Sequence, residues 1–124
     1  MYLNEKSTNT AYVLGRTFAV LEMIQKRALG DKINATIKDK YFASACSNPS
    51  LVFPSLLKLA QNHLAKIEGL YFNHLLSECL SLLGSDSFPK VMSMDNQGRF
   101  ILGYYQQNQK LYEKKSNSID MEGK

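Results

Sequence analysis

The sequence predicts an all-α protein, a single domain folded as a bundle of about five helices. Three observations support this prediction. Apolar residues recur at helical spacing along most of the chain. The segments between the apolar stretches are short and contain Gly, Pro or Asn, and no stretch shows the strict alternation of a half-buried strand. A length of 124 residues suffices for one hydrophobic core.

The first helix is expected over residues 11–29, with an apolar stripe broad enough for packing on more than one side. Asn9 or Thr10 is suited to cap its start, and Gly30 follows its last turn, where a left-handed residue is common. Gly15 lies inside this helix and lowers its propensity by about 1 kcal/mol relative to Ala. A close crossing by another backbone would account for it.

The second helix is expected to begin with Asn34 as its N-cap and to end near Cys46. Asn48 then caps a third helix that has Pro49 at its first position. Pro54 lies too deep for the first turn of that helix, so a kink or a restart is predicted there.

A strongly apolar helix is expected over residues 70–83, ended by Gly84. In the loop that follows, Phe88 is expected to reach the core, and Ser93 to cap a last helix that ends near Lys115. The predicted organisation is a flexible segment over residues 1–10, the bundle over 11–115, and a disordered tail over 116–124.

The composition does not favour a secreted or membrane-spanning protein. No apolar run approaches the roughly 20 residues of a membrane helix, and the polar residues 1–10 are not a secretory signal. The glycosylation sequon at Asn34 therefore carries no expectation of a glycan, and we expect a cytoplasmic location. Cys46 and Cys79 are expected to be buried thiols.

No arrangement of residues predicts an enzyme. His63 and His74 are the only histidines; their spacing matches no zinc-protease pattern, and no carboxylate pair lies near either in helical register. The sequence has no P-loop, no dinucleotide-binding fingerprint and no nucleophile elbow. We therefore expect no catalysis, no cofactor and no metal.

The charge distribution is the stronger functional signal. The segment from Lys32 to Lys66 contains five lysines and one acidic residue, Asp39, and so accounts for the whole formal excess of +4. A local excess of this kind attracts polyanions. Lysines that merely solvate helix surfaces remain the alternative.

Two further features leave alternatives open. Tyr104, Tyr105 and Tyr112 lie at helical spacing, which fits core packing as well as a platform for stacking bases. Small residues around Ser44 form one narrow face of the second helix. That face would admit either a phosphate or a neighbouring helix.

Three segments carry a resemblance to a known family: "AYVLGRTFAVLEMIQ", "NATIKDKYFASACSNPSLVFPSLLKLAQNHLAKI" and "QGRFILGYYQQNQ". They closely resemble the C-terminal region of the large subunit of the type I-C CRISPR Cascade surveillance complex. In that family this region is a helical bundle, and it is also made as a separate small subunit by internal translation. A chain of this size, with Met1 just before the first segment, resembles that small subunit.

The resemblance implies a set of partners: the backbone subunits that carry the guide RNA, the large subunit, other copies of the chain, and target DNA, mainly its displaced strand. It implies a non-catalytic role in assembling the complex and stabilising the R-loop through backbone contacts, without reading sequence. The residues expected to line a groove for single-stranded DNA are Arg16, Arg27, Lys32, Lys38, Lys40, Lys58 and Lys66.

Two positions depart from the family pattern. Lys40 stands where the family has arginine, which removes a bidentate fork, and Gln106 stands where histidine is expected. The alternative function is a structural adaptor that never touches DNA. An autonomous helix-turn-helix regulator is disfavoured, because the helices around "SNP" lack base-reading residues at the expected positions.

Overall fold

The computed structural model describes residues 3–32, 34–67, 69–84 and 88–122, and it describes only the backbone of residue 31 and of residues 114–122. The described residues form an all-α bundle, as predicted, with five α-helices and one short 3-10 helix. The elements in chain order are α1 (Thr10–Leu29), η1 (Gly30–Lys32), α2 (Ile37–Ser47), α3 (Pro49–Leu64), α4 (Leu70–Leu83) and α5 (Met94–Glu122).

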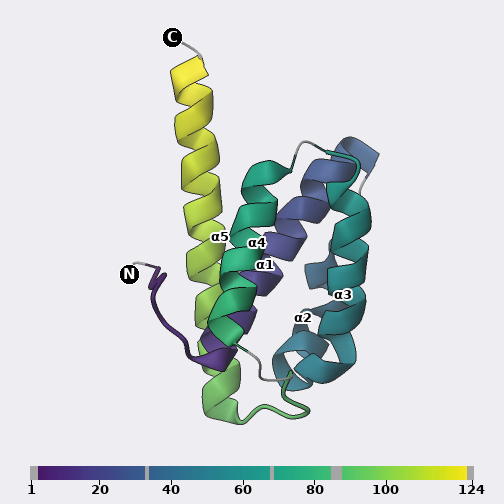
Figure 1. Cartoon of the computed structure of the whole chain (residues 1–124). Helices are drawn as coiled ribbons and strands as arrows, with labels where there is room; N and C mark the ends of the chain where they lie inside the picture. The colour runs from purple at the N-terminus through teal and green to yellow at the C-terminus, as the bar shows by residue number, and fades with distance from the viewer. Residues whose placement is uncertain (1–2, 33, 68, 85–87, 123–124) are drawn as a thin grey trace.

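Helix α1 is the central element of the bundle. It contacts each of the other four helices, with α5 along one side of it and α3 along the other (Figure 1). Every residue from Ala11 to Gln25 is buried, which confirms the prediction of packing on more than one side. Asn9 caps the helix by accepting the backbone N–H of Tyr12 at 3.0 Å, and Gly30 ends it at a φ of 54°.

The core is centred on an aromatic cluster around Phe18 of α1, which is fully buried. Its ring lies edge-on to four other rings with centroid distances between 5.5 and 6.4 Å, a favoured geometry for aromatic pairs. These rings come from α2, α3 and α5: Phe42, Phe53, Phe100 and Tyr104. Phe88 stacks on Phe53 at 5.4 Å, so the predicted anchoring of the loop to the core is confirmed.

Helices α1 and α5 cross without side chains between their backbones. A Cβ atom added to Gly15 would lie 2.0 Å from the carbonyl oxygen of Phe100, and one added to Gly103 would lie 2.2 Å from that of Tyr12. The close crossing expected at Gly15 is therefore confirmed. Gly103 is its counterpart on the other helix, and together they let the two longest helices share an interior.

Two predictions of local structure are wrong. Helix α2 begins at Ile37, and its N-cap is Thr36, not Asn34. The carboxylate of Asp39 accepts the backbone N–H of Thr36 at 2.9 Å, which satisfies a donor at the helix start. Of the kink or restart predicted at Pro54, the restart is also wrong, because α3 continues through this residue to Leu64. The kink stays a prediction.

The remaining boundaries agree with the pattern except at the end of the chain. Helix α4 has its predicted bounds, and Ser93 accepts the backbone N–H of Asn96 at the start of α5. Helix α5 ends at Glu122, beyond the predicted end near Lys115. The side chains of residues 114–122 lie outside the described part, so the disorder predicted for 116–124 stays a prediction.

Candidate nucleic-acid interface

One of the basic residues expected at the surface lies inside the bundle. Arg16 of α1 is only 2% exposed. Its Nε donates to Oε1 of Gln107 on α5 at 2.9 Å, and its Nη1 donates to the carbonyl oxygen of Glu5 at 3.5 Å. Arg16 thus ties α1 to α5 and to the N-terminal segment, and it reaches the outside only at the wall of a 260 Å³ pocket.

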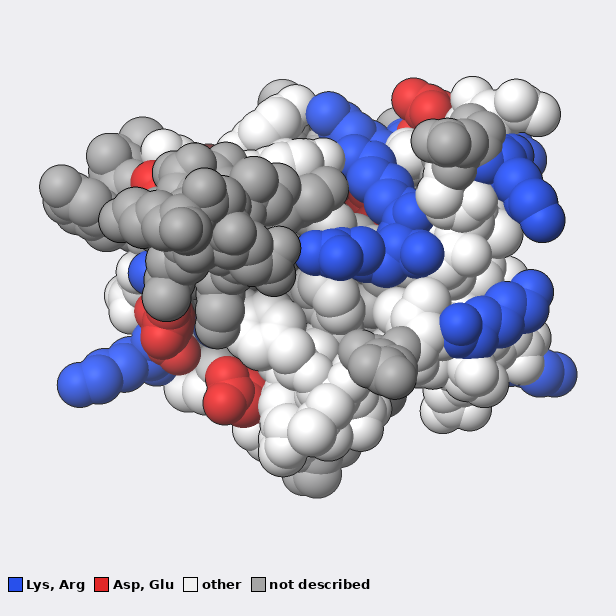
Figure 2. All heavy atoms as spheres, turned by 90° about the horizontal axis from the view of Figure 1, so that it is seen from above, with Lys and Arg blue, Asp and Glu red and all other residues white. Residues whose placement is uncertain are grey.

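Four basic residues gather where α1 and α3 end and α4 begins (Figure 1). We call this group the basic end: Lys26, Arg27, Lys32 and Lys66. Three of them are exposed and Lys26 is partly buried. Figure 2 looks onto this end and shows Lys and Arg side chains gathered toward one side of it, with few Asp or Glu side chains among them. The structure therefore brings together the predicted residues Arg27, Lys32 and Lys66.

The basic end has both a structural and an electrostatic consequence. Lys26 and Arg27 occupy the last turn of α1, where positive charge complements the partial negative charge of a helix C-terminus. The guanidinium of Arg27 also lies over the ring of Phe72 at 5.6 Å. Burial lowers the pKa of His63, and the positive charge of Lys66 lowers it further. A cation–π contact and a place at a helix C-terminus leave the positive charge of a side chain unneutralised.

Two lysines lie against tyrosines of α5. Lys26 Nζ donates to the hydroxyl of Tyr112 at 2.9 Å, and Lys38 Nζ donates to that of Tyr105 at 3.1 Å. The ammonium of Lys38 lies 4.9 Å from the ring centroid of Tyr105, within cation–π range. Burial acts to lower the pKa of Lys26, but the Tyr112 hydrogen bond and the charge of Glu22 outweigh it, and the pKa is raised.

The structure separates the roles of the three tyrosines. Tyr104 is 2% exposed and donates to the buried carboxylate of Glu22, so it belongs to the core. Burial, followed by that hydrogen bond, raises the pKa of Tyr104. Tyr105 and Tyr112 are 50% and 40% exposed. Their rings are accessible to a partner, each beside a lysine ammonium.

The remaining predicted residues are exposed but lie elsewhere. Lys40 is on α2, and Lys58 is in the middle of α3, before the end of that helix at the basic end. Ser44 is also exposed, so packing against another helix of this chain does not explain the small residues around it.

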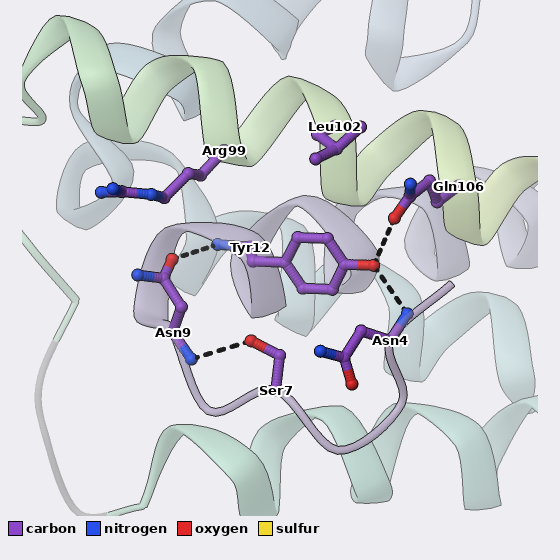
Figure 3. Close-up of a pocket in the computed structure, with 7 residues that line it drawn as sticks. All are labelled: Asn4, Ser7, Asn9, Tyr12, Arg99, Leu102 and Gln106. Carbon is purple, nitrogen blue, oxygen red and sulfur yellow. Dashed lines mark hydrogen bonds between the residues drawn. The ribbon is translucent and has the colours of Figure 1, made fainter. Parts of the chain in front are cut away.

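A polar pocket between the N-terminal segment and α5 is a feature that the sequence did not predict. Its volume is about 310 Å³ (Figure 3). The residues that line it are Asn4, Ser7, Asn9, Tyr12, Arg99, Leu102 and Gln106. The backbone N–H of Asn4 donates to the hydroxyl of Tyr12 at 2.9 Å, and the flexibility predicted for residues 1–10 stays a prediction. The Asn and Ser residues just before α1 are the one feature of the sequence that could have indicated a polar pocket there.

The described residues contain neither a cluster of metal ligands nor a membrane-spanning helix. No three or more His, Cys, Asp and Glu side chains come together there as a metal site would require. In the same part of the chain, none of the helices combines the length and the apolar character needed to cross a membrane.

Comparison with known proteins gives one result. The model of a protein family described as CRISPR-associated protein (Cas_Csd1) matches residues 1–112. No curated protein matches the chain. The family match includes α1 to α4, α5 as far as Tyr112, and all the residues of the basic end.

Proposed function

The chain belongs to the Cas_Csd1 family of CRISPR-associated proteins, and from this premise we propose that it is a non-catalytic part of a type I-C RNA-guided surveillance complex. In this role it acts as the small subunit in the prokaryotic cytoplasm. It helps to assemble the complex and stabilises the R-loop through contacts with the displaced strand and with the guide–target heteroduplex. Its partners are the guide-carrying backbone subunits, the large subunit and other copies of itself.

The basic end is the observation that supports contact with DNA. Three exposed basic residues, Arg27, Lys32 and Lys66, come from three separate segments and meet at one end of the bundle. Strand exchange in an R-loop is close to balanced, so a few contacts to the sugar–phosphate backbone suffice to shift it. Such contacts need positive charge and no sequence reading, which is what this end offers.

The test is charge reversal within the assembled complex. The variant Arg27→Glu, Lys32→Glu, Lys66→Glu should weaken binding of target duplex by about tenfold or more at moderate salt, because each lost phosphate contact removes the release of a counterion that favours binding. The loss should also lower the salt dependence of binding. Permanganate reactivity of thymines in the displaced strand measures R-loop opening, and a gel shift at several salt concentrations measures affinity.

A matched control separates the basic end from net charge. Lys6, Lys90 and Lys110 are exposed and lie outside the basic end, and their reversal to Glu changes the charge by the same amount. This control should leave R-loop opening close to that of the natural chain. Equal losses in the two variants would contradict the assignment of the DNA contact to the basic end. Reversal of Lys38, Lys40 and Lys58 tests the other predicted residues in the same assay.

A purely structural adaptor is the second candidate function. Three large apolar side chains are more than 70% exposed near the junction of α2 and α3: Leu51, Val91 and Met94. Backbone hydrogen bonds from Ser50 to Pro89 and from Met92 to Ser47 hold their two segments together. Exposed apolar side chains that lie together favour contact with another protein subunit.

A further inference from the structure

The amide side chains around the polar pocket have their oxygen atoms already engaged. Oδ1 of Asn4 accepts the backbone N–H of Lys6 at 3.1 Å, and Oδ1 of Asn9 accepts that of Tyr12 at 3.0 Å. Oε1 of Gln106 accepts the hydroxyl of Tyr12 at 2.5 Å. Figure 3 shows the last two of these bonds on either side of the Tyr12 ring. Each amide therefore has its NH₂ group left to offer to a ligand.

The other polar groups of the pocket also act as donors. The hydroxyl of Ser7 accepts the backbone N–H of Asn9 at 3.3 Å and still has its own proton to donate. Arg99 uses Nη1 to bond Oδ1 of Asn96 at 2.9 Å, which leaves N–H groups on its other nitrogens. The hydroxyl of Tyr12 both accepts and donates within the protein. Its oxygen is thus occupied on both sides.

The charge of the pocket matches this set of donors. Among the described residues that line it, Arg99 is the one charged residue, and none of them contributes a carboxylate. The donors come from the N-terminal segment on one side and from α5 on the other. A ligand that satisfies them needs several acceptor atoms, negative charge and no donors of its own. A phosphate group meets all three conditions, and its tetrahedral oxygens accept from several directions.

We propose that the pocket formed by Asn4, Ser7, Asn9, Arg99 and Gln106 binds a phosphate group. The N-terminal segment, which lines the pocket, runs beside α5 away from the end at which α1 and α3 terminate (Figure 1). This site is separate from the basic end, and it does not depend on the proposed role in an R-loop. A cavity of about 310 Å³ has room for a phosphate together with the group that carries it.

The test is a titration of the purified full chain with inorganic phosphate at constant ionic strength, followed by NMR. The side-chain amide signals of Asn4, Asn9 and Gln106 and the Nε–H signal of Arg99 should shift and saturate together. Acetate and chloride serve as reference anions and should give shifts that do not saturate over the same range. Shifts that are linear in phosphate, or equal for acetate and phosphate, would overturn the proposal.

Three substitutions test the donors one at a time. Gln106→Glu keeps an oxygen acceptor for Tyr12 and replaces the free NH₂ by negative charge, and Arg99→Gln removes the only positive charge. Each should weaken phosphate binding by about tenfold or more, as expected for a lost charge-assisted hydrogen bond. Asn9→Asp keeps an oxygen that caps the helix and replaces the NH₂ group by a carboxylate oxygen, so it should also weaken phosphate binding.

A charge control and a check of folding complete the experiment. Lys90→Gln removes one exposed positive charge outside the pocket and should leave phosphate affinity unchanged. The backbone amide spectrum of each variant reports whether the bundle is intact. If Arg99→Gln and Gln106→Glu both retain the natural affinity in a folded chain, the pocket is not the phosphate site.

Two further probes distinguish the sources of the phosphate. Thymidine 5′-monophosphate presents a terminal phosphate, and a short oligothymidine with free hydroxyl ends presents only phosphodiesters. Shifts of the pocket signals at lower concentrations of the oligonucleotide would assign the site to a strand backbone, and the opposite order would assign it to a terminal or free phosphate. If neither compound shifts these signals, the proposal fails even though inorganic phosphate binds.

Discussion

At the residue scale, Gly15 and Gly103 let the backbones of α1 and α5 come into contact, because a Cβ atom on either would lie within 2.2 Å of a carbonyl oxygen of the other helix. Gly15 was identified as a close crossing because glycine inside a helix needs a reason. Its counterpart Gly103 was missed, because the pairing joins segments far apart in the chain. Distance along the chain also explains the error at Arg16. Its charge predicts an exposed side chain, but Oε1 of Gln107, ninety-one positions later, accepts a hydrogen bond from its guanidinium in the interior.

The two glycines of α5 and the one of α1 give a direct test of the crossing. Gly15→Ala should lower the free energy of unfolding by about 3 kcal/mol, because its methyl group has no space beside the Phe100 backbone and the helices must separate. Chemical denaturation followed by circular dichroism measures the change. Gly98→Ala is the matched control, since a Cβ there meets nothing within 4 Å.

The control should change stability in the opposite direction. Gly98 is exposed inside α5, so alanine should raise the free energy of unfolding by about 0.5–1 kcal/mol through helix propensity. If Gly15→Ala were as stable as the natural chain, the α1–α5 crossing described above would be incorrect.

At the element scale, helix existence and type were predictable, and among the helix starts only that of α2 was predicted wrongly. The periodic apolar residues and the glycines gave the bounds of α1 and α4 within a residue. For α2, Asn34 and Thr36 are both residue types that cap helices, and tertiary contacts decide between them. Gln25 of α1 accepts the backbone N–H of Ile37 at 2.8 Å, which places the first turn of α2 at Ile37 and leaves Asn34 outside it.

Capping of α2 is therefore predicted to depend on Asp39 and not on Asn34. Asp39→Ala removes the acceptor for the Thr36 N–H and should lower the free energy of unfolding by about 1 kcal/mol. Asn34→Ala should lie within about 0.5 kcal/mol of the natural chain, as for most exposed positions. Urea denaturation of the two variants compares them. A larger loss of unfolding free energy for Asn34→Ala than for Asp39→Ala would contradict this assignment and support Asn34 as the N-cap.

At the scale of the whole molecule, the bundle has two ends of different chemistry. The excess of lysine was visible in the sequence, but its arrangement was not, because α1, η1 and the end of α3 meet only in the folded chain. Arg27, Lys32 and Lys66 come together there, while Arg16, Lys40 and Lys58 do not. The opposite end carries Leu51, Val91 and Met94, which no periodicity predicted to be exposed together.

This polarity predicts that assembly and DNA contact can be separated by mutation. Leu51→Ser, Val91→Ser, Met94→Ser should leave the chain folded, because these side chains are already exposed in the isolated chain. In a complex purified through another subunit, the amount of this variant that is retained should fall severalfold, because the apolar area that a neighbouring subunit would cover is lost. The charge-reversed basic end should instead be retained in full and form R-loops weakly. Quantifying the chain per guide RNA in each complex measures retention, and full retention of the apolar variant would exclude this end as the subunit contact.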